Sequence, residues 1–177
     1  FVHSSLIEKV SQPLTGWLGH IKPFDFEVKY QPANDINKFI CGTPPIIAYK
    51  AIESGLEIFK ELSIKEIRTK STRLSEMFIQ LIQQECNQFG FTLFSPKNSD
   101  QRGSQISFLH ENAYPIIQAL ISHGIIGDYR EPNIMRFGIS PLYMRFEDVW
   151  NAITCLREIM QTGEWQSEKF KNKNYVT

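Results

Sequence analysis

The sequence has no excess charge of either sign and no long apolar run. Nineteen basic residues balance nineteen acidic ones, so the formal net charge is zero. This balance removes the electrostatic basis for a dedicated binder of nucleic acid or of an anionic membrane surface. The densest apolar stretch, residues 44–49, ends at Lys50. It is far shorter than the roughly 20 apolar residues that a membrane-spanning helix needs, so the sequence predicts no membrane span.

Cysteine and histidine are too scarce and too scattered to indicate a disulfide framework or a metal site. The three cysteines stand far apart, at positions 41, 86 and 155. Their odd number and wide spacing predict free thiols in a reducing compartment. The four histidines form no H-E-x-x-H motif and no Cys/His cluster, which excludes the common zinc patterns. The glycine-rich phosphate loops and the G-x-S-x-G nucleophile motif are also absent.

The sequence does have enough apolar residues for a sizeable core. Hydrophobic residues make up 42% of the 177 positions, and 22 of those residues are aromatic, which excludes a wholly disordered chain. The length suits one domain or a piece of a larger protein. The chain opens at Phe1 without an initiator methionine, a basic head or a signal-peptide core. We therefore expect it to be part of a longer polypeptide.

The first half of the chain predicts a loop-rich segment followed by two helices. Residues 1–43 are rich in glycine and proline and show no sustained period, so we expect a loop and short-strand remnant of a larger domain. Thr43 before two prolines predicts a helix start with a hydroxyl cap. Ser63 and Glu66 match a capping box and predict a second helix that runs to Gly90. Residues 44–90 are thus predicted to be two linking helices that bend at Ser63.

Residues 91–165 are predicted to form a small α+β domain. Short β-like runs at 91–94 and 105–109 precede an amphipathic helix around 114–121. Two further strands are expected at 125–126 and 134–140, and a last helix at 146–160. This order predicts a mostly antiparallel sheet covered by helices on one face, an α/β fold class overall. Residues 166–177 are polar, and we expect them to be a frayed tail.

Three positions carry candidate chemistry, each with a plainer structural reading beside it. Thr43 at a helix start could bind an anion such as phosphate, or it could simply cap the helix. Arg136 lies in a strand-like run whose alternation points it away from the core residues Met135 and Phe137. Its guanidinium could hold a carboxylate by two hydrogen bonds, or it could be a surface arginine. Trp17 lies between two glycines and could offer an N–H or a stacking face, or anchor a loop.

Two neighbouring charged motifs indicate less. Residues 102–105 begin with Arg102 and suggest a turn that enters a strand. Asp128 and Arg130 suggest a charged turn, whose place beside the Arg136 strand would allow a supporting role there. From the residues alone, the chain carries a phosphate corner and a carboxylate clamp as hypotheses, and no reaction follows from them.

Five ordered motifs together resemble the C-terminal half of kynureninase, in particular the bacterial type, and the resemblance covers residues 1–165. They are residues 16–20, 39–46, 102–105, 126–130 and 135–143. The resemblance implies the C-terminal portion of a fold type I enzyme that depends on pyridoxal 5'-phosphate (PLP). It also implies a cytoplasmic homodimer that hydrolyses L-kynurenine, or its 3-hydroxy form, to anthranilate, or 3-hydroxyanthranilate, and L-alanine. Those reactions belong to tryptophan catabolism and NAD biosynthesis.

The resemblance also assigns roles to the three candidate residues. Trp17 and Thr43 match the family positions that hydrogen-bond the cofactor phosphate across the dimer interface. Arg136 matches the position that binds the substrate α-carboxylate. The family's Schiff-base lysine would lie upstream of Phe1, and no lysine here stands in the matching context. The chain by itself is therefore expected to carry no catalytic residue and to be inactive alone.

Two alternatives stay open at this point. Cysteine desulfurases and selenocysteine lyases share the implied fold, but they need a mobile catalytic cysteine. Cys41, Cys86 and Cys155 are expected in strand-like or helix-like runs, which argues against that reaction. The other alternative is a non-catalytic module that serves dimerisation alone. A lysine motif upstream in the same reading frame would favour the enzyme.

Overall fold

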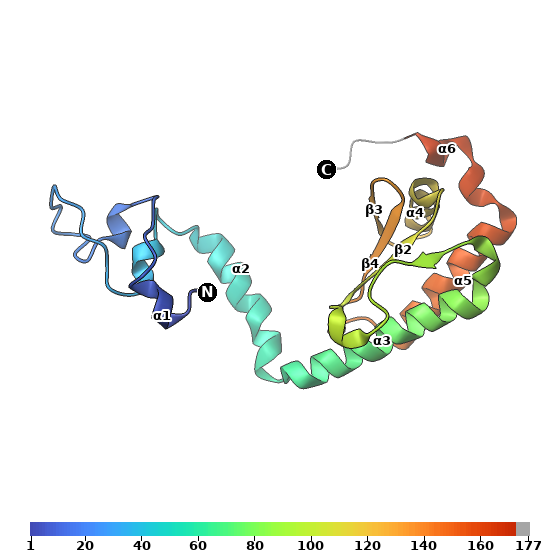
Figure 1. Ribbon diagram of the computed structural model, residues 1–177, viewed down its shortest axis with the longest axis horizontal. Coiled ribbons are helices and arrows are strands. Elements are labelled where there is room, and N and C mark those ends of the chain that lie inside the picture. The colour runs from blue at the N-terminus through green and yellow to red at the C-terminus, as the bar shows by residue number, and fades with distance from the viewer. Residues whose placement is uncertain (173–177) are drawn as a thin grey trace. The chain divides into compact units, whose positions relative to one another are not determined.

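The structure is a computed structural model that describes residues 1–172, and these residues form two compact units (Figure 1). The first unit ends at Glu61 and the second begins at Leu62. The sequence predicted segment boundaries at 43/44 and 90/91, whereas the two compact units of the structure meet between Glu61 and Leu62. The reason lies in the helix that follows Ser63, because its apolar face is buried in the core of the second unit.

The first unit consists of short helices joined by irregular segments, whereas loops and short strands were predicted for residues 1–43. Its elements are α1 (Ser4–Ile7), η1 (Trp17–Gly19), η2 (Ile36–Phe39), α2 (Ile46–Glu57) and η3 (Ile58–Lys60). The expected short strands are reduced to a single bridge between His20 and Pro32. Lys38 is buried here, and its ammonium group donates to the Ile7 carbonyl. The hydroxyl of Tyr30 donates to the Gly19 carbonyl over 3.1 Å.

Helix α2 begins later than predicted, and Thr43 does not cap it. The N-cap is Pro45, and no side chain caps the helix. A residue that precedes proline is restricted to extended conformations. Thr43 and Pro44 each precede a proline, so neither can enter the helix, which starts only after the second proline. The Thr43 hydroxyl consequently lies two residues before the N-cap.

The second unit is a four-stranded antiparallel sheet covered by helices on one face, as predicted (Figure 1). The strand order is β1-β2-β4-β3. The strands are β1 (Thr92–Leu93), β2 (Gln105–Leu109), β3 (Asp128–Arg130) and β4 (Ile134–Gly138). The principal helices are α3 (Ile64–Glu85), α4 (Ala113–Ser122) and α5 (Phe146–Thr162). Short elements complete the unit: η4 (Asn87–Phe89), η5 (Ser99–Gln101), η6 (Glu164–Gln166) and α6 (Glu168–Lys171).

The core of this unit lies between the sheet and the helices. Alternate residues of β2 and β4 point into it, among them Phe108 and Phe137. Phe78 of α3 packs on both rings, with its ring centroid 4.9 Å from that of Phe137. Helix α3 starts with the predicted capping box, in which Ser63 and Glu66 satisfy each other's backbone N–H groups. The hydrogen bonds from Ser63 lower the pKa of the Glu66 carboxyl.

The strand expected at 125–126 lies instead at 128–130. Gly124 adopts a left-handed conformation with φ of 81°, and the chain then passes close over the core. A Cβ at Gly127 would lie 2.7 Å from the side chain of Ile117 and 3.0 Å from that of Phe137. Residues 125–127 therefore pack against α4 and β4, and strand pairing begins only at Asp128.

The tail prediction is wrong over the part that the structure describes. Residues 164–171 form η6 and α6, and Phe170 is only 6% exposed. The hydroxyl of Tyr114 donates to the carbonyl of Asn172 over 3.0 Å. A buried aromatic ring thus ties this segment to α4, although its sequence is mostly polar. The remaining residues of the expected tail, 173–177, lie outside the described residues.

Across residues 1–172, the structure contains no helix with the length and apolar content that crossing a bilayer requires.

Candidate functional site

The Trp17 loop and the segment that leads to Thr43 are packed tightly against each other. A Cβ at Gly16 would lie 2.3 Å from the carbonyl oxygen of Cys41, which leaves no room for any side chain. A Cβ at Gly19 would lie 3.0 Å from the carbonyl oxygens of Lys38 and Ile40. The two glycines are required by this close approach of backbones. As a result, the first unit brings Trp17 beside the segment that carries Thr43.

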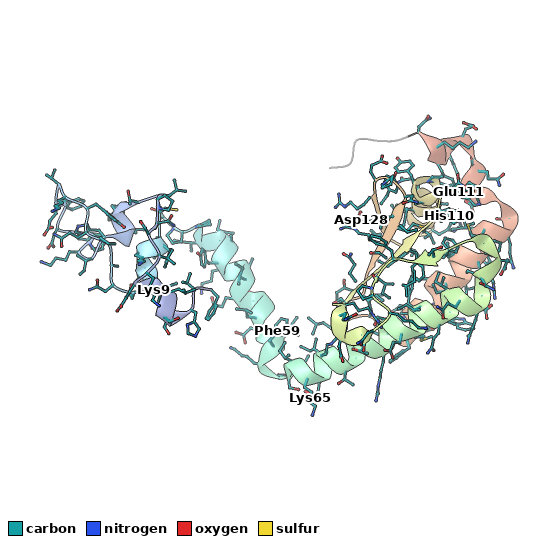
Figure 2. The ribbon with its side chains drawn as sticks, viewed as in Figure 1. Lys9, Phe59, Lys65, His110, Glu111 and Asp128 are labelled. Atoms are coloured by element: carbon teal, nitrogen blue, oxygen red, sulfur yellow. The ribbon has the colours of Figure 1, made fainter. Side chains whose placement is uncertain are left out.

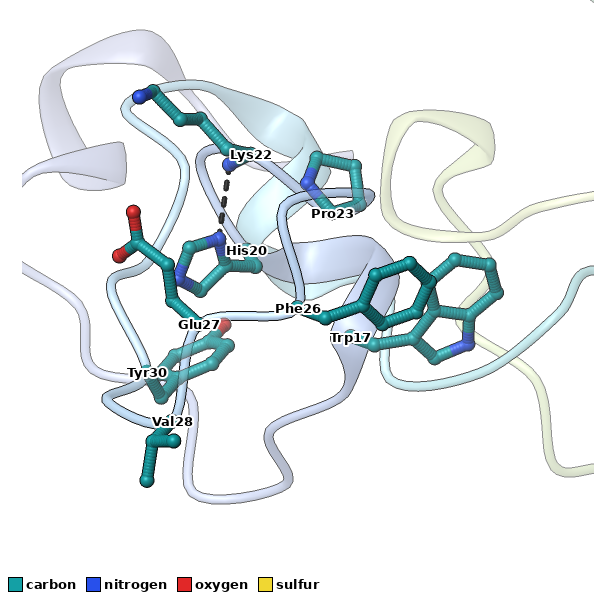
Figure 3. Close-up of a pocket in the computed structure, with 8 residues that line it drawn as sticks. All are labelled: Trp17, His20, Lys22, Pro23, Phe26, Glu27, Val28 and Tyr30. Carbon is teal, nitrogen blue, oxygen red and sulfur yellow. Dashed lines mark hydrogen bonds between the residues drawn. The ribbon is translucent and has the colours of Figure 1, made fainter.

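Trp17 lies at the rim of an open pocket of about 250 Å³ (Figure 3). The indole is 48% exposed and meets Phe24 edge to face at 5.4 Å between ring centroids. Phe26 and His20 line the same pocket, and Nδ1 of His20 accepts from the backbone N–H of Lys22 (Figure 3). The indole N–H makes no hydrogen bond to any residue in the described part of the chain, so it is free to donate to a ligand.

Thr43 is exposed, and its hydroxyl likewise makes no hydrogen bond within residues 1–172. The helix that follows has twelve residues, no capping side chain and no acidic residue in its first turn. The free N–H groups and the positive end of the helix dipole at such a start favour an anion. A hydroxyl and an indole N–H, presented by adjoining segments, therefore fit the donor set that a phosphate group needs.

Arg136 lies on β4, on the face of the sheet opposite the core, as strand alternation predicts. Its neighbours Met135 and Phe137 are buried on the helix-covered face. The register places Asp128 of β3 directly opposite Arg136 on one side and Ser107 of β2 on the other. Figure 2 shows Asp128 at β3.

The surroundings of Arg136 are those of a held side chain, in contrast to a free surface arginine. Its side chain is 29% exposed, and its Nη2 lies 2.5 Å from Oδ2 of Asp128. Nη2 of Arg130 lies 3.2 Å from the same oxygen. The Arg136 Nε is buried and has no hydrogen-bond partner among the described residues. Two guanidinium groups around one carboxylate leave a net positive charge, which suits a second, incoming carboxylate.

The three predicted site residues fall in different units. Trp17 and Thr43 lie in the first unit, and Arg136 lies in the second. Asp128 was predicted to lie in a charged turn that would allow a supporting role beside the Arg136 strand, and the structure pairs it directly with Arg136. The signal was available, because a hairpin that turns at residues 131–133 places positions 128 and 136 opposite each other.

The cysteines differ from expectation at one position. Cys41 is exposed and lies outside any helix or strand, so the expectation of a strand-like or helix-like run is wrong there. Cys86 is buried at the end of α3, and burial raises the pKa of its thiol to about 11. Burial also raises the pKa of the Cys155 thiol in α5. In the described part of the chain, no three His, Cys, Asp or Glu residues gather as metal ligands would.

Comparison with known proteins identifies the family. The family described as "Kynureninase C-terminal domain" matches residues 67–156, which is just over half of the chain and includes both Asp128 and Arg136. The chain belongs to the kynureninase family. Kynureninase of Pseudomonas fluorescens is 43% identical over 177 residues, which are 100% of this chain and 42% of that protein. Kynureninase of Burkholderia mallei (strain SAVP1) is 44% identical over 166 residues, 94% of this chain and 40% of that protein.

The chain thus spans about two fifths of the length of the curated kynureninases that it matches. The matched family confirms the resemblance to kynureninase that the five sequence motifs predicted. It does not favour the desulfurase alternative.

Solved structures show the fold. An apo cysteine desulfurase from Thermococcus onnurineus NA1 superposes with a TM-score of 0.76 at 15% identity, covering 92% of this chain and 42% of that one. A C-DES mutant with glycine covalently linked to the PLP cofactor gives 0.70 at 15% identity, covering 89% and 40%. At this identity the likeness concerns the fold alone. It confirms the prediction that this chain has the C-terminal portion of a fold type I architecture.

Proposed function

We propose that this chain is part of a PLP-dependent hydrolase that cleaves the Cβ–Cγ bond of L-kynurenine or 3-hydroxy-L-kynurenine. The products would be L-alanine and anthranilate or 3-hydroxyanthranilate, in tryptophan catabolism and NAD biosynthesis in the cytoplasm. The observation that carries the proposal is the Asp128–Arg136 pair within the matched family domain. Asp128 holds the Arg136 guanidinium in place, where it can bind the carboxylate of a substrate.

Arg136 would bind the substrate α-carboxylate. A guanidinium offers two parallel donors to the two carboxylate oxygens, which fixes orientation as well as position. When its carboxylate is held, the substrate amino acid can no longer turn freely in the site. The bond to be broken is then kept in the orientation that the reaction needs. The protein's contribution at this residue is therefore positioning.

Trp17 and Thr43 would hold the phosphate end of PLP, and their unpaired N–H and hydroxyl groups fit that task. When bound, PLP supplies an electron sink for the carbanion that forms next to the substrate nitrogen. The chain's own residues would orient two groups, a cofactor phosphate through the Trp17 loop and a substrate carboxylate through Arg136. The lysine that anchors the cofactor in the family would come from outside this chain.

The proposed assembly is a homodimer in which Trp17 and Thr43 reach the cofactor bound by the partner subunit. In support, one face of α2 exposes a contiguous row of apolar side chains, which is typical of an interaction surface. Its members are Ile46, Tyr49, Ile52 and Leu56. A monomeric mass for the full-length holoenzyme in light scattering would contradict this assembly.

The decisive experiment is Arg136→Lys in the full-length protein. Lysine keeps the charge but cannot reproduce two-pronged binding, so kcat/KM for kynurenine should fall by roughly ten- to hundred-fold, the cost of one charge-assisted hydrogen bond. The absorption spectrum of bound PLP should not change, because Arg136 is assigned to the substrate. A substrate analogue without the α-carboxylate should bind wild type and variant equally. A kcat/KM within about twofold of wild type would return Arg136 to a surface arginine.

A further inference from the structure

We infer that Asp128 is a positioning residue that sets the orientation of the Arg136 guanidinium for carboxylate binding. The inference rests on the proposed function, because it gives Arg136 its ligand. Asp128 belongs to β3 and is fixed opposite Arg136 by the backbone register of the β3–β4 hairpin. Side chains directly opposite in an antiparallel pair point to the same face at close range. The fold therefore builds the contact into the sheet itself.

The geometry shows how a single contact can fix the whole guanidinium. Arg136 Nη2 donates to Asp128 Oδ2 over 2.5 Å, a direct charge-assisted hydrogen bond. The Arg136 Nε is buried without a hydrogen-bond partner among residues 1–172, so the protein blocks access to the Nε side of the guanidinium. With one N–H of Nη2 donated to Asp128 and Nε buried, Nη1 and the second N–H of Nη2 are left to meet a ligand.

Charge alone does not account for the arrangement. Asp128 sits next to a site for an anion, and a carboxylate there weakens the attraction that Arg136 exerts on a second carboxylate. Its side chain is 43% exposed, so solvent screens this opposing effect and keeps it small. Asp128 therefore favours binding of a carboxylate only if the gain from orienting the Arg136 guanidinium is larger than the loss from cancelling part of its positive charge.

Orientation and charge can be separated by three variants of the full-length holoenzyme. Asp128→Asn keeps an acceptor oxygen at the same reach and removes the charge. Asp128→Glu keeps the charge and displaces the oxygen by one methylene group. Asp128→Ala removes both. If Asp128 acts by position, the Asn variant keeps KM for kynurenine within about threefold, whereas the Glu and Ala variants raise KM roughly tenfold or more and change kcat less.

Binding measurements make the result independent of turnover. Calorimetric titration with L-alanine should show the same order of variants, and ethylamine, which is alanine without its carboxylate, should bind all of them alike. Asp148→Ala is the matched control, because it removes another close Asp–Arg pair of the second unit, with Arg145 at 2.7 Å, outside the site. It should leave both titrations unchanged.

Three outcomes overturn the inference. If the Asn and Ala variants behave alike, Asp128 acts by its charge, and if all three variants match wild type, Asp128 has no role in binding. A variant that loses PLP or binds ethylamine more weakly reports a general structural defect and also counts against a positioning role. Failure of the wild type to turn over kynurenine would instead refute the proposed function, while the alanine titrations would still test Asp128.

Discussion

His110 is a buried histidine whose two ring nitrogens are both engaged by the backbone. Nδ1 accepts from the N–H of Asn112 at 3.0 Å, and Nε2 donates to the carbonyl of Phe89 at 2.9 Å. The ring also packs on Phe91, with 4.8 Å between centroids, and Figure 2 shows His110 beside Glu111. Burial lowers the pKa of His110, against the smaller opposing effects of the Phe89 carbonyl and Glu111.

This lowered pKa predicts a loss of stability in mild acid. The unfolded chain takes up a proton on this histidine below its ordinary pKa of about 6.5, whereas the folded chain resists it. The contribution is therefore complete above about pH 6.5 and is lost as the pH falls toward the lower folded pKa. Urea denaturation between pH 5 and 7.5 should show this slope in wild type and a flatter one in His110→Asn. His3→Asn, at an exposed position, is the control; an equal slope in all three proteins would refute the prediction.

Trp17 and Thr43 should each contribute one hydrogen bond to the retention of PLP. In the full-length protein, Trp17→Phe and Thr43→Ala each remove one donor to a charged group, so the dissociation constant should rise by roughly ten- to hundred-fold. Fluorescence titration of the apoenzyme with PLP measures the change. Because both side chains are exposed and neither makes a side-chain hydrogen bond within the described chain, the fold should be unaffected. Unchanged dissociation constants in both variants would remove the two residues from the cofactor site.

At the scale of elements, α2 and α3 begin in different ways, and this difference can be measured. Ser63 and Glu66 close a complete capping box at the start of α3, with Ser63 N–H donating to Glu66 over 2.9 Å. Ser63→Ala should lower the free energy of unfolding by about 0.5–2 kcal/mol, the usual cost of losing a cap.

Thr43→Ala serves as the matched change at α2, which has no side-chain cap. It should leave the free energy of unfolding unchanged, in contrast to what the sequence pattern predicts. Urea denaturation followed by circular dichroism gives both values. Equal losses in the two variants would mean that Thr43 does cap α2 in solution.

At the scale of the whole molecule, the chain should not hold PLP covalently by itself. Lys38 is the buried lysine of the described residues, and its ammonium group is already bonded to the Ile7 carbonyl. No lysine of the chain, Lys38 included, stands in the sequence context expected of the family's Schiff-base lysine, and the chain spans only about two fifths of its curated relatives. Incubation with PLP, borohydride reduction and intact mass spectrometry should show no stoichiometric adduct. A saturable adduct at a single lysine would contradict this expectation, and the full-length protein is the positive control.

Several features could be predicted from the sequence because they depend on neighbouring residues. The capping box at Ser63 needs only residues three apart, and the helix at Phe146–Thr162 needs only an apolar stripe of helical period. Strand alternation alone placed Arg136 opposite the core face. The ordered motifs carried the family resemblance, and the matched family confirms it.

The tertiary structure decided what depends on residues distant in the chain. The late start of α2 is an exception, because it follows from a local rule: two consecutive prolines exclude Thr43 from the helix, and the prediction gave the cap pattern more weight. The packing of Gly127 against Ile117 delays the third strand to Asp128, and that register creates the contact with Arg136. The burial of Phe170 orders a polar segment through a surface that α4 supplies. In the last two cases the packing partner is not a sequence neighbour. Hydrophobic periodicity and residue propensity depend on neighbouring residues, so they cannot predict such a contact.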